Sequence, residues 1–238
     1  SRGLGDVYKR QWQYPVIIDN MMNLELLFEA SLLTGDNAFY DIANAHAATT
    51  LKNHFRADYS SWHVVDYDTI SGKARLKQTH QGYADSSAWA RGQSWALYGF
   101  AMTYRYTKNK KYLHQAQHIA DFIFTHPNMP SDFVPYWDFN DPKIPDTFRD
   151  VSAACVCASA LYELATYNPN RKEQYVAWAD RILASLLQDY LVEEGKCKGF
   201  LLLHSVGNMP SKDEIDVPIS YADYYFLEAL LRRDSLSK

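Results

Sequence analysis

The most informative run of residues in the chain reads Thr79-His80-Gln81-Gly82-Tyr83-Ala84-Asp85-Ser86-Ser87-Ala88-Trp89-Ala90-Arg91-Gly92-Gln93-Ser94-Trp95. No proline interrupts the chain from Trp89 to Tyr106, which favours a helix there. Arg91 and Trp95 would then share a helix face, because such pairs are helix-surface neighbours. A guanidinium beside an aromatic plate suits a planar, carboxylated sugar ring. The same spacing fits a buried tryptophan pair with Arg91 in a structural ion pair, and the residues alone favour this second interpretation.

Helical spacing continues on the N-terminal side of this run. Leu24, Leu27 and Phe28 follow the spacing of one helix face after Asp19, and Gly35 is a natural residue to end that helix. Asp36 can cap a second helix. Residues 56–79 lack the helical period, and Trp62-His-Val-Val-Asp-Tyr67 alternates like a short strand.

Further helices are predicted on the C-terminal side. The apolar positions indicate a helix that ends at Pro127, a clear one over 151–165, one over about 175–190 and a last one over about 221–232. The segment 127–148 holds five prolines and is predicted to be a loop, and 193–219 is predicted to be a polar loop. With the helices before and within the central run, this makes seven.

A repeat underlies the helices. Three polar turns end on an aromatic residue, at Tyr40, Tyr112 and Tyr175. Each turn joins two helices, so the repeating unit is a helical hairpin. Hairpins in series bury an inner layer of helices against one another. The pattern predicts an all-α protein.

Composition narrows the class of protein further. With 238 residues, of which 47% are hydrophobic, the chain can bury the core of a single domain. A net charge of −4 gives no electrostatic reason to expect nucleic acid as a partner. No apolar run approaches the ~20 residues of a membrane span. Cys155, Cys157 and Cys197 are interpreted as free thiols, because their spacing is not that of a disulfide framework.

The central run resembles the signature of glycoside hydrolase family 88, the unsaturated glucuronyl hydrolases. The matching residues are Thr-His-Gln-Gly from Thr79 and Trp-Ala-Arg-Gly-Gln-Ser-Trp from Trp89. Further matches are Val16-Ile-Ile-Asp19, Tyr136-Trp-Asp-Phe139, Phe148-Arg-Asp150 and Asp223-Tyr-Tyr-Phe. They occur in the order of the family and run from Val16 almost to the C-terminus.

The resemblance implies a fold and a reaction. The family fold is an (α/α)6 barrel of six helical hairpins, of which seven helices would be roughly half. The reaction is the protonation and hydration of a 4,5-unsaturated uronic acid at the non-reducing end of an oligosaccharide, with release of the aglycone. It requires no metal and no organic cofactor.

The resemblance also implies roles for residues. Asp19 matches the general acid/base, although an Asp before a helix is more commonly a cap, and a proton donor there needs burial to raise its pKa. The positions that match the sugar site are His63, His80, Gln81, Trp89, Arg91 and Trp95. Trp89 and Trp95 would stack on the ring, and Arg91 and the polar groups would hold the carboxylate and hydroxyls. For His80, a hydrogen-bonded core histidine is the alternative. Arg149 is expected either at the site or in an ion pair with Asp138 or Asp150.

The start of the chain bears on the domain organisation. Asp6-Val-Tyr-Lys-Arg-Gln11 matches the translation of a transposon end used in sequencing libraries, so we expect residues 1–11 to be a non-native leader. Residues 12–238 are then expected to be the C-terminal part of one catalytic domain. The family's second essential aspartate belongs in an Asp-His-His-Asp-like motif, which this sequence does not contain. We therefore expect the chain alone to be inactive.

Two other functions compete with this one. The sister family of unsaturated rhamnogalacturonyl hydrolases shares the fold and mechanism. A non-catalytic sugar-binding scaffold of helical hairpins is the alternative from another class, and it has no need of a proton donor at Asp19.

Overall fold

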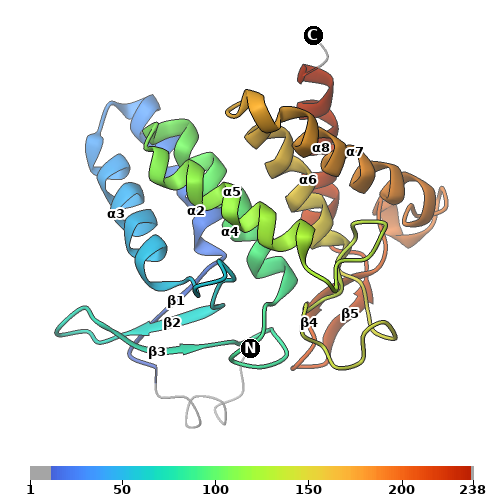
Figure 1. Ribbon diagram of the computed structural model, residues 1–238, viewed down its shortest axis with the longest axis horizontal. Helices are drawn as coiled ribbons and strands as arrows, with labels where there is room; N and C mark the ends of the chain where they lie inside the picture. The colour runs from blue at the N-terminus through green and yellow to red at the C-terminus, as the bar shows by residue number, and fades with distance from the viewer. Residues whose placement is uncertain (1–11, 237–238) are drawn as a thin grey trace.

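The computed structural model describes residues 12–236, so the expected leader at 1–11 lies outside the described residues. Within this range the chain forms seven α-helices and two small antiparallel sheets (Figure 1). The helices are α2 (Asn20–Thr34), α3 (Asn37–Asn53), α4 (Ala90–Thr107), α5 (Lys110–Thr125), α6 (Val151–Ala165), α7 (Lys172–Asp189) and α8 (Ser220–Leu236). All the predicted helices are present. None of the helices among these residues is both long and apolar enough to cross a membrane.

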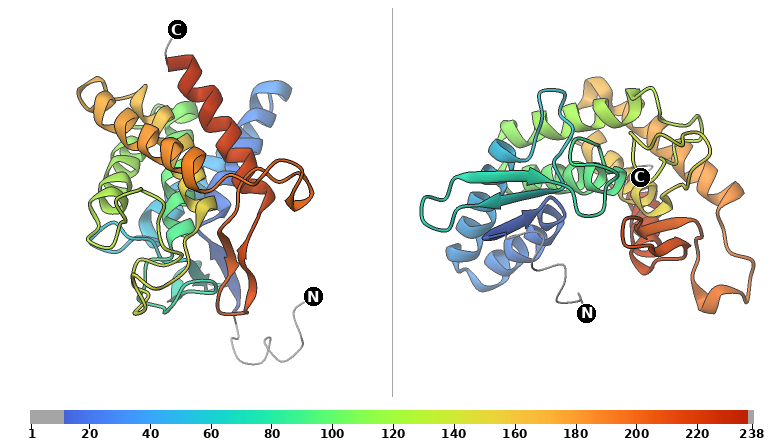
Figure 2. Two further views of the ribbon diagram at one scale, coloured as in Figure 1. Left: turned by 90° about the vertical axis from the view of Figure 1, so that its right-hand side faces the viewer. Right: turned by 90° about the horizontal axis from the view of Figure 1, so that it is seen from below.

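The helices form two layers. In the inner layer α2, α4, α6 and α8 pack side by side in that order, while α3, α5 and α7 pack outside against α2, α4 and α6. Each outer helix follows its inner partner along the chain, which makes the predicted helical hairpin. Seen from below, the hairpins follow an arc with α2 and α8 near its two ends (Figure 2). The arc is the arrangement predicted for part of an (α/α)6 barrel.

Burial distinguishes the middle of the arc from its ends. Every residue of α6 is buried, as expected for a helix covered on all sides. The helices at the ends bury only one face, with Met21, Leu24 and Phe28 inward on α2. The opposite faces carry exposed leucines, among them Leu33 on α2, which is 84% exposed, and Leu231 on α8, which is 70% exposed.

The turns between the helices follow the predicted chemistry. Gly35 ends α2 in the left-handed conformation, with φ of 75°, where a glycine is not strained. The Asp36 side chain then accepts a hydrogen bond from the Ala38 N–H at 2.9 Å and caps α3. Tyr112 and Tyr175, from the repeated turns, are buried in the first turns of α5 and α7.

Close packing of α2 on α4 depends on Gly99. A Cβ atom at this position would lie 2.4 Å from the Met21 Cβ and 3.0 Å from its backbone carbonyl carbon. These distances are shorter than carbon atoms tolerate, so only a glycine lets the two helices approach this closely. The contact matters for function because Met21 follows Asp19 in the first turn of α2.

The sheets were only partly predicted. β2 (Val64–Tyr67) lies inside the predicted strand, and it pairs with β1 (Tyr14–Ile17) and β3 (Ala74–Gln78). The prediction of a loop over 193–219 is wrong in part, because β4 (Ser205–Asn208) and β5 (Asp213–Val217) form a hairpin there. β4 contains a glycine and an asparagine, and β5 contains three acidic residues and only two apolar ones, so neither is rich in the residue types that reveal a strand.

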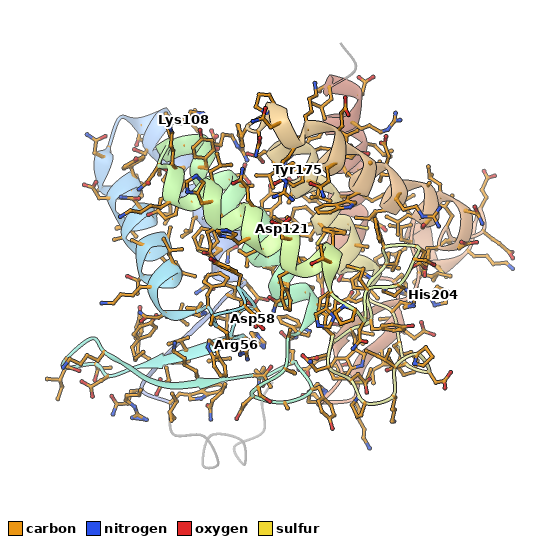
Figure 3. The ribbon with its side chains drawn as sticks, in the orientation of Figure 1. Arg56, Asp58, Lys108, Asp121, Tyr175 and His204 are labelled. Carbon is orange, nitrogen blue, oxygen red and sulfur yellow. The ribbon has the colours of Figure 1, made fainter. Side chains whose placement is uncertain are left out.

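A network of charged side chains joins the inner helices at the end away from the sheets. Arg105 on α4 contacts Glu25 on α2 at 2.8 Å and Glu163 on α6 at 2.9 Å. Arg232 on α8 contacts Glu163 at 2.7 Å. Lys108, the residue after α4, marks this end of the molecule in Figure 3. The network ties all four inner helices together, through the C-terminal halves of α4, α6 and α8, and leaves the helix N-termini to face the sheets.

Candidate active site

The N-terminal ends of the inner helices gather the residues that the sequence singled out. Asp19 precedes α2, Trp89 precedes α4 and Asp150 precedes α6, while Tyr221 lies in the first turn of α8. Helix N-termini present unpaired N–H groups and a partial positive charge. This end of the arc is therefore electrostatically suited to a carboxylated ligand.

Asp19 does not act as a helix cap. Its backbone already has helical angles, with φ of −55° and ψ of −32°, and its side chain makes no capping hydrogen bond. The carboxyl group is instead about 20% exposed, and its Oδ2 atom is buried without a hydrogen-bond partner among the described residues. A carboxyl group held this way is available for chemistry.

Burial raises the pKa of Asp19 to about 6. The desolvation of the carboxylate is the largest cause, and it outweighs the opposing effects of Arg91, a backbone hydrogen bond and a hydrogen bond from the Trp95 side chain. A carboxyl group with this pKa is partly protonated near neutral pH, so it can both give and take a proton. Burial therefore raises the pKa of Asp19, as a proton donor at this position needs.

His63 is the residue placed against Asp19. Its Nε2 lies 3.6 Å from Asp19 Oδ2, and its side chain is almost fully buried. Its ring stacks on Trp89, with centroids 4.3 Å apart. The predicted site residues Asp19, His63 and Trp89 therefore lie together, from three separate segments of the chain.

Arg91 lies in a buried ion pair. Its Nη1 is 2.9 Å from Asp150 Oδ2 and also donates to the Val206 carbonyl, and its Nη2 donates to the Gly207 carbonyl at 2.6 Å. The side chain is 3% exposed, and its guanidinium carbon lies 4.6 Å from the centre of the Trp89 ring. The geometry fits Arg91 as a member of a structural ion pair better than it fits a guanidinium free to bind a sugar carboxylate.

The two tryptophans are buried in the same way. Trp89 is 2% exposed and Trp95 is 4% exposed. Trp95 contacts Tyr225 of α8 edge to face, with centroids 5.3 Å apart, and its side chain lies beside Asp19. In this structure both rings position neighbouring site residues, and neither presents an open face for a sugar.

A pocket of about 440 Å³ lies against the site. Three of the predicted contact residues line it, namely His63, His80 and Gln81. Ile17 and Asn20, the chain on either side of Asp19, line it as well. A larger pocket of about 570 Å³ lies between α3 and the three-stranded sheet and is lined by none of the predicted site residues.

Asp138 organises the loop that carries His80 and Gln81. Its Oδ2 accepts from the Tyr83 N–H at 2.8 Å and from Ser87 Oγ at 2.7 Å, and its Oδ1 accepts from the Asn140 N–H at 2.9 Å. Arg56, labelled in Figure 3, supports the same loop by donating to the Asp85 and Ser87 carbonyls. The side chain of Asp138 is fully buried, so its role is to fix this loop.

The expected partners of Arg149 need correction. Arg149 pairs neither with Asp138 nor with Asp150, because its Nη1 lies 2.9 Å from Asp132 Oδ1. Asp150 is instead the partner of Arg91 and also caps α6 through the Ser152 N–H at 3.1 Å. Sequence spacing did not identify the Arg91–Asp150 pair, because its members lie on different hairpins.

No group of three or more His, Cys, Asp or Glu side chains among residues 12–236 is arranged to hold a metal ion. Cys155, Cys157 and Cys197 are free thiols, as predicted. The chemistry that this arrangement supports is proton transfer by Asp19 beside a polar pocket.

Comparisons with known proteins identify relatives of this chain. The chain is 55% identical over 232 residues to an unsaturated glucuronyl hydrolase of Formosa agariphila, which covers 97% of this chain and 58% of that protein. A solved unsaturated glucuronyl hydrolase described as specific for heparin superposes with a TM-score of 0.93 at 50% identity, over 95% of this chain and 61% of that one. No family model matches the chain.

A third relative has a sugar in place. It is an unsaturated glucuronyl hydrolase variant from Streptococcus agalactiae complexed with dGlcA-GalNAc6S, with a TM-score of 0.80 at 33% identity over 91% of this chain and 58% of that one. The chain thus spans less than two thirds of the length of each of these three relatives. Sequence identity and superposition run through nearly the whole chain, so it belongs to the unsaturated glucuronyl hydrolases of glycoside hydrolase family 88.

Proposed function

We propose that the protein carrying this chain is a hydrolase of oligosaccharides that end in a 4,5-unsaturated uronic acid, and that Asp19 is its general acid and base. The observation that carries the proposal is the Asp19 carboxyl group, whose pKa is raised to about 6 next to a polar pocket. A scaffold that only binds sugar has no need of such a group, because a buried carboxyl with a raised pKa reduces stability.

The proposed reaction begins at the enol ether. Asp19 protonates C4 of the C4=C5 double bond, and positive charge develops at C5 and the ring oxygen. The carboxylate left on Asp19 then takes a proton from a water molecule as the water oxygen bonds to C5. The resulting hemiketal opens to a ketone at C5, and the hemiacetal left at C1 releases the aglycone. One carboxyl group gives a proton and then recovers one, so no cofactor enters the scheme.

The substrate class is inferred from the relatives. One structure is described as specific for heparin and another holds dGlcA-GalNAc6S, so we propose unsaturated disaccharides from glycosaminoglycans as the substrates. His63, His80 and Gln81 line the pocket, and the side chains of His80 and Gln81 are the proposed polar contacts for the sugar. Trp89, Arg91 and Trp95 are buried, so they would act indirectly, by holding in place the residues that contact the sugar.

We further propose that residues 12–238 are one part of a catalytic domain. The support for this is the share of the relatives that the chain spans, 58% for the Formosa protein, and the missing motif with a second aspartate. The rest of the barrel would close the open side of the arc and complete the pocket.

The test is an activity assay on the full-length protein that carries this chain, following the loss of the ultraviolet absorbance of the enol ether. We expect turnover of unsaturated heparin- or chondroitin-derived disaccharides and slower turnover of an unsaturated rhamnogalacturonan disaccharide. Faster turnover of the pectin-derived compound would assign the protein to the sister activity. Binding of saturated and unsaturated uronides with equal affinity and no turnover would favour the scaffold.

A further inference from the structure

His63 faces Asp19 with its Nε2 atom, and its other ring nitrogen, Nδ1, is held by two hydrogen bonds. His63 Nδ1 accepts hydrogen bonds from the backbone N–H of His80 at 3.2 Å and from that of Gln81 at 3.1 Å. A ring nitrogen that accepts a hydrogen bond carries no hydrogen of its own. The single hydrogen of a neutral His63 must therefore sit on Nε2, the nitrogen that faces Asp19.

The Asp19 side of the pair has an unused acceptor. Asp19 Oδ2 is buried without a hydrogen-bond partner among the described residues, and His63 Nε2 lies 3.6 Å from it. This distance is longer than a hydrogen bond, and catalytic hydrogen bonds often tighten only when the site is loaded. The N–H is thus in place to meet the charge on Oδ2 once Asp19 has given up its proton.

We propose that the backbone N–H groups of His80 and Gln81 lock His63 in its Nε2–H tautomer, so that His63 is a permanent hydrogen-bond donor for Asp19 and takes no part in proton transfer. His63 is then a positioning residue that acts through Asp19. This role rests on the proposed function of Asp19, whereas the tautomer itself does not.

The two N–H donors cannot turn away from His63, because their loop is held on both sides. Before them, the Thr79 N–H donates to Asp85 Oδ1 at 2.8 Å. After them, the Gly82 N–H donates to Thr79 Oγ1 at 2.8 Å. The Gln81 side chain adds a hydrogen bond of 2.8 Å to the Gly207 carbonyl. The donors are fixed by contacts that do not involve substrate.

The surroundings of His63 also oppose a second proton. Burial lowers its pKa well below the usual value, and His80, Arg91 and His54 lower it further by their charges when protonated. Among the described residues, Asp19 is the one acidic side chain within 4 Å of a His63 ring nitrogen. A doubly protonated His63 would put N–H against the two backbone N–H groups, so the ring should stay neutral over the physiological range.

The chain contains its own control for the tautomer. The buried residue His54 has Nδ1 at 3.2 Å from the Trp62 carbonyl oxygen, which can only accept. The hydrogen of His54 must therefore sit on Nδ1, opposite to His63. Its pKa is lowered to about 4, mainly by burial, so it too should stay neutral. Two buried neutral histidines of opposite tautomer give a contrast within one sample.

The first test is nitrogen NMR of the histidine rings in the ¹⁵N-labelled full-length protein, between about pH 5 and 8, where an ordinary histidine titrates. The His63 signals are assigned by their loss in His63→Asn. We expect hydrogen on Nε2 for His63 and on Nδ1 for His54, with no change across the pH range. Hydrogen on Nδ1 of His63, or titration of His63 in this range, would overturn the proposal.

The second test measures the pKa of Asp19 by its carboxyl ¹³C signal, in the native protein and in two variants. His63→Phe keeps a flat ring against Trp89 but has no donor, so the pKa of Asp19 should rise by about one unit. His63→Gln keeps an amide donor, so the rise should be smaller. An unchanged pKa in His63→Phe would overturn the donor role. If His63→Phe does not fold, the first test still decides the tautomer, and His63→Leu, which also has no donor, takes the place of His63→Phe in the second test.

These outcomes are separate from the proposed function. A locked His63 in a protein that turns over no unsaturated uronide would leave the tautomer standing and remove the proposed activity. An active enzyme whose His63 titrates would do the reverse.

Discussion

Asp19 shows at the scale of one residue how function and stability oppose each other. Its raised pKa means that the folded protein binds the Asp19 proton more tightly than the unfolded chain does. Stability from this group is fully present below about pH 4, the unfolded pKa, and is lost as the pH rises through about 6. At neutral pH the ionised carboxyl therefore weakens the fold.

The substitution Asp19→Asn should accordingly stabilise the protein at neutral pH. The gain in unfolding free energy is at most about 3 kcal/mol, and it should vanish near pH 4 because Asp19 is then protonated and resembles Asn. Thermal unfolding of both proteins across this range is the measurement. Asp58→Asn is the exposed control: the pKa of Asp58 is lowered, so this substitution should not stabilise the protein at neutral pH. Equal stability of native and Asp19→Asn at every pH would contradict the raised pKa.

Arg91 offers a second test at this scale. Lysine cannot reproduce the bonds to Asp150, Val206 and Gly207 together, so Arg91→Lys should lower the unfolding free energy by about 1–3 kcal/mol. Arg233→Lys, in a half-exposed ion pair with Asp180, is the control and should have little effect. A higher KM with unchanged stability would instead show that Arg91 holds the sugar carboxylate.

At the scale of elements, the packing of α2 on α4 places Asp19, which precedes α2, next to Trp95 of α4. Gly99→Ala should push these helices apart, because its Cβ would overlap Met21, and should cost about 1–3 kcal/mol of stability. Gly35→Ala is the comparison, since no atom lies within 4 Å of its Cβ and only its positive φ is strained. Chemical denaturation measures both. A Gly99→Ala variant as stable as the native protein would mean that the helices can separate freely.

The elements also show what sequence alone could predict. The helices were predictable because α4, α5, α6 and α7 bury long apolar faces, and because Gly35 and Asp36 mark the turn between α2 and α3. The β4–β5 hairpin was not predictable, because its strands are short and poor in β-branched and aromatic residues, and because Gly207 packs against Glu214. The selection of Asp19 and His63 as site residues came from the family resemblance.

The buried roles of Arg91 and Trp95 could not be predicted, because they depend on contacts between hairpins. Asp150 lies 59 residues from Arg91 along the chain, and the Gly207 carbonyl lies 116 residues away. The residue types in a motif indicate that a guanidinium and an indole ring are adjacent. They do not indicate whether the two side chains face a ligand or the core.

The molecule as a whole leaves apolar surface at both ends of the arc. Leu26, Leu32 and Leu33 on α2 and Leu231 on α8 are 70–84% exposed. Contiguous exposed apolar surface of more than a few hundred Å² favours association. We therefore expect residues 12–238, expressed alone, to self-associate and to have little or no activity.

Size-exclusion chromatography with light scattering measures this association. Leu33→Gln should reduce it, whereas Leu187→Gln on the outer helix α7, which is 49% exposed, should not. A monodisperse, active monomer of residues 12–238 would contradict the proposal that this chain is part of a larger domain.

The central claim about the whole molecule is that Asp19 supplies the proton for the enol ether. Asp19→Asn in the full-length protein keeps the shape of the side chain and removes its acid. Loss of a general acid costs about 10²–10⁴-fold in rate, and here one group serves both steps, so we expect kcat to fall by at least about 10⁴-fold with substrate binding retained. The measurement is turnover of an unsaturated disaccharide by the two proteins at the pH of maximal activity. Activity of Asp19→Asn within about tenfold of the native protein would contradict the account.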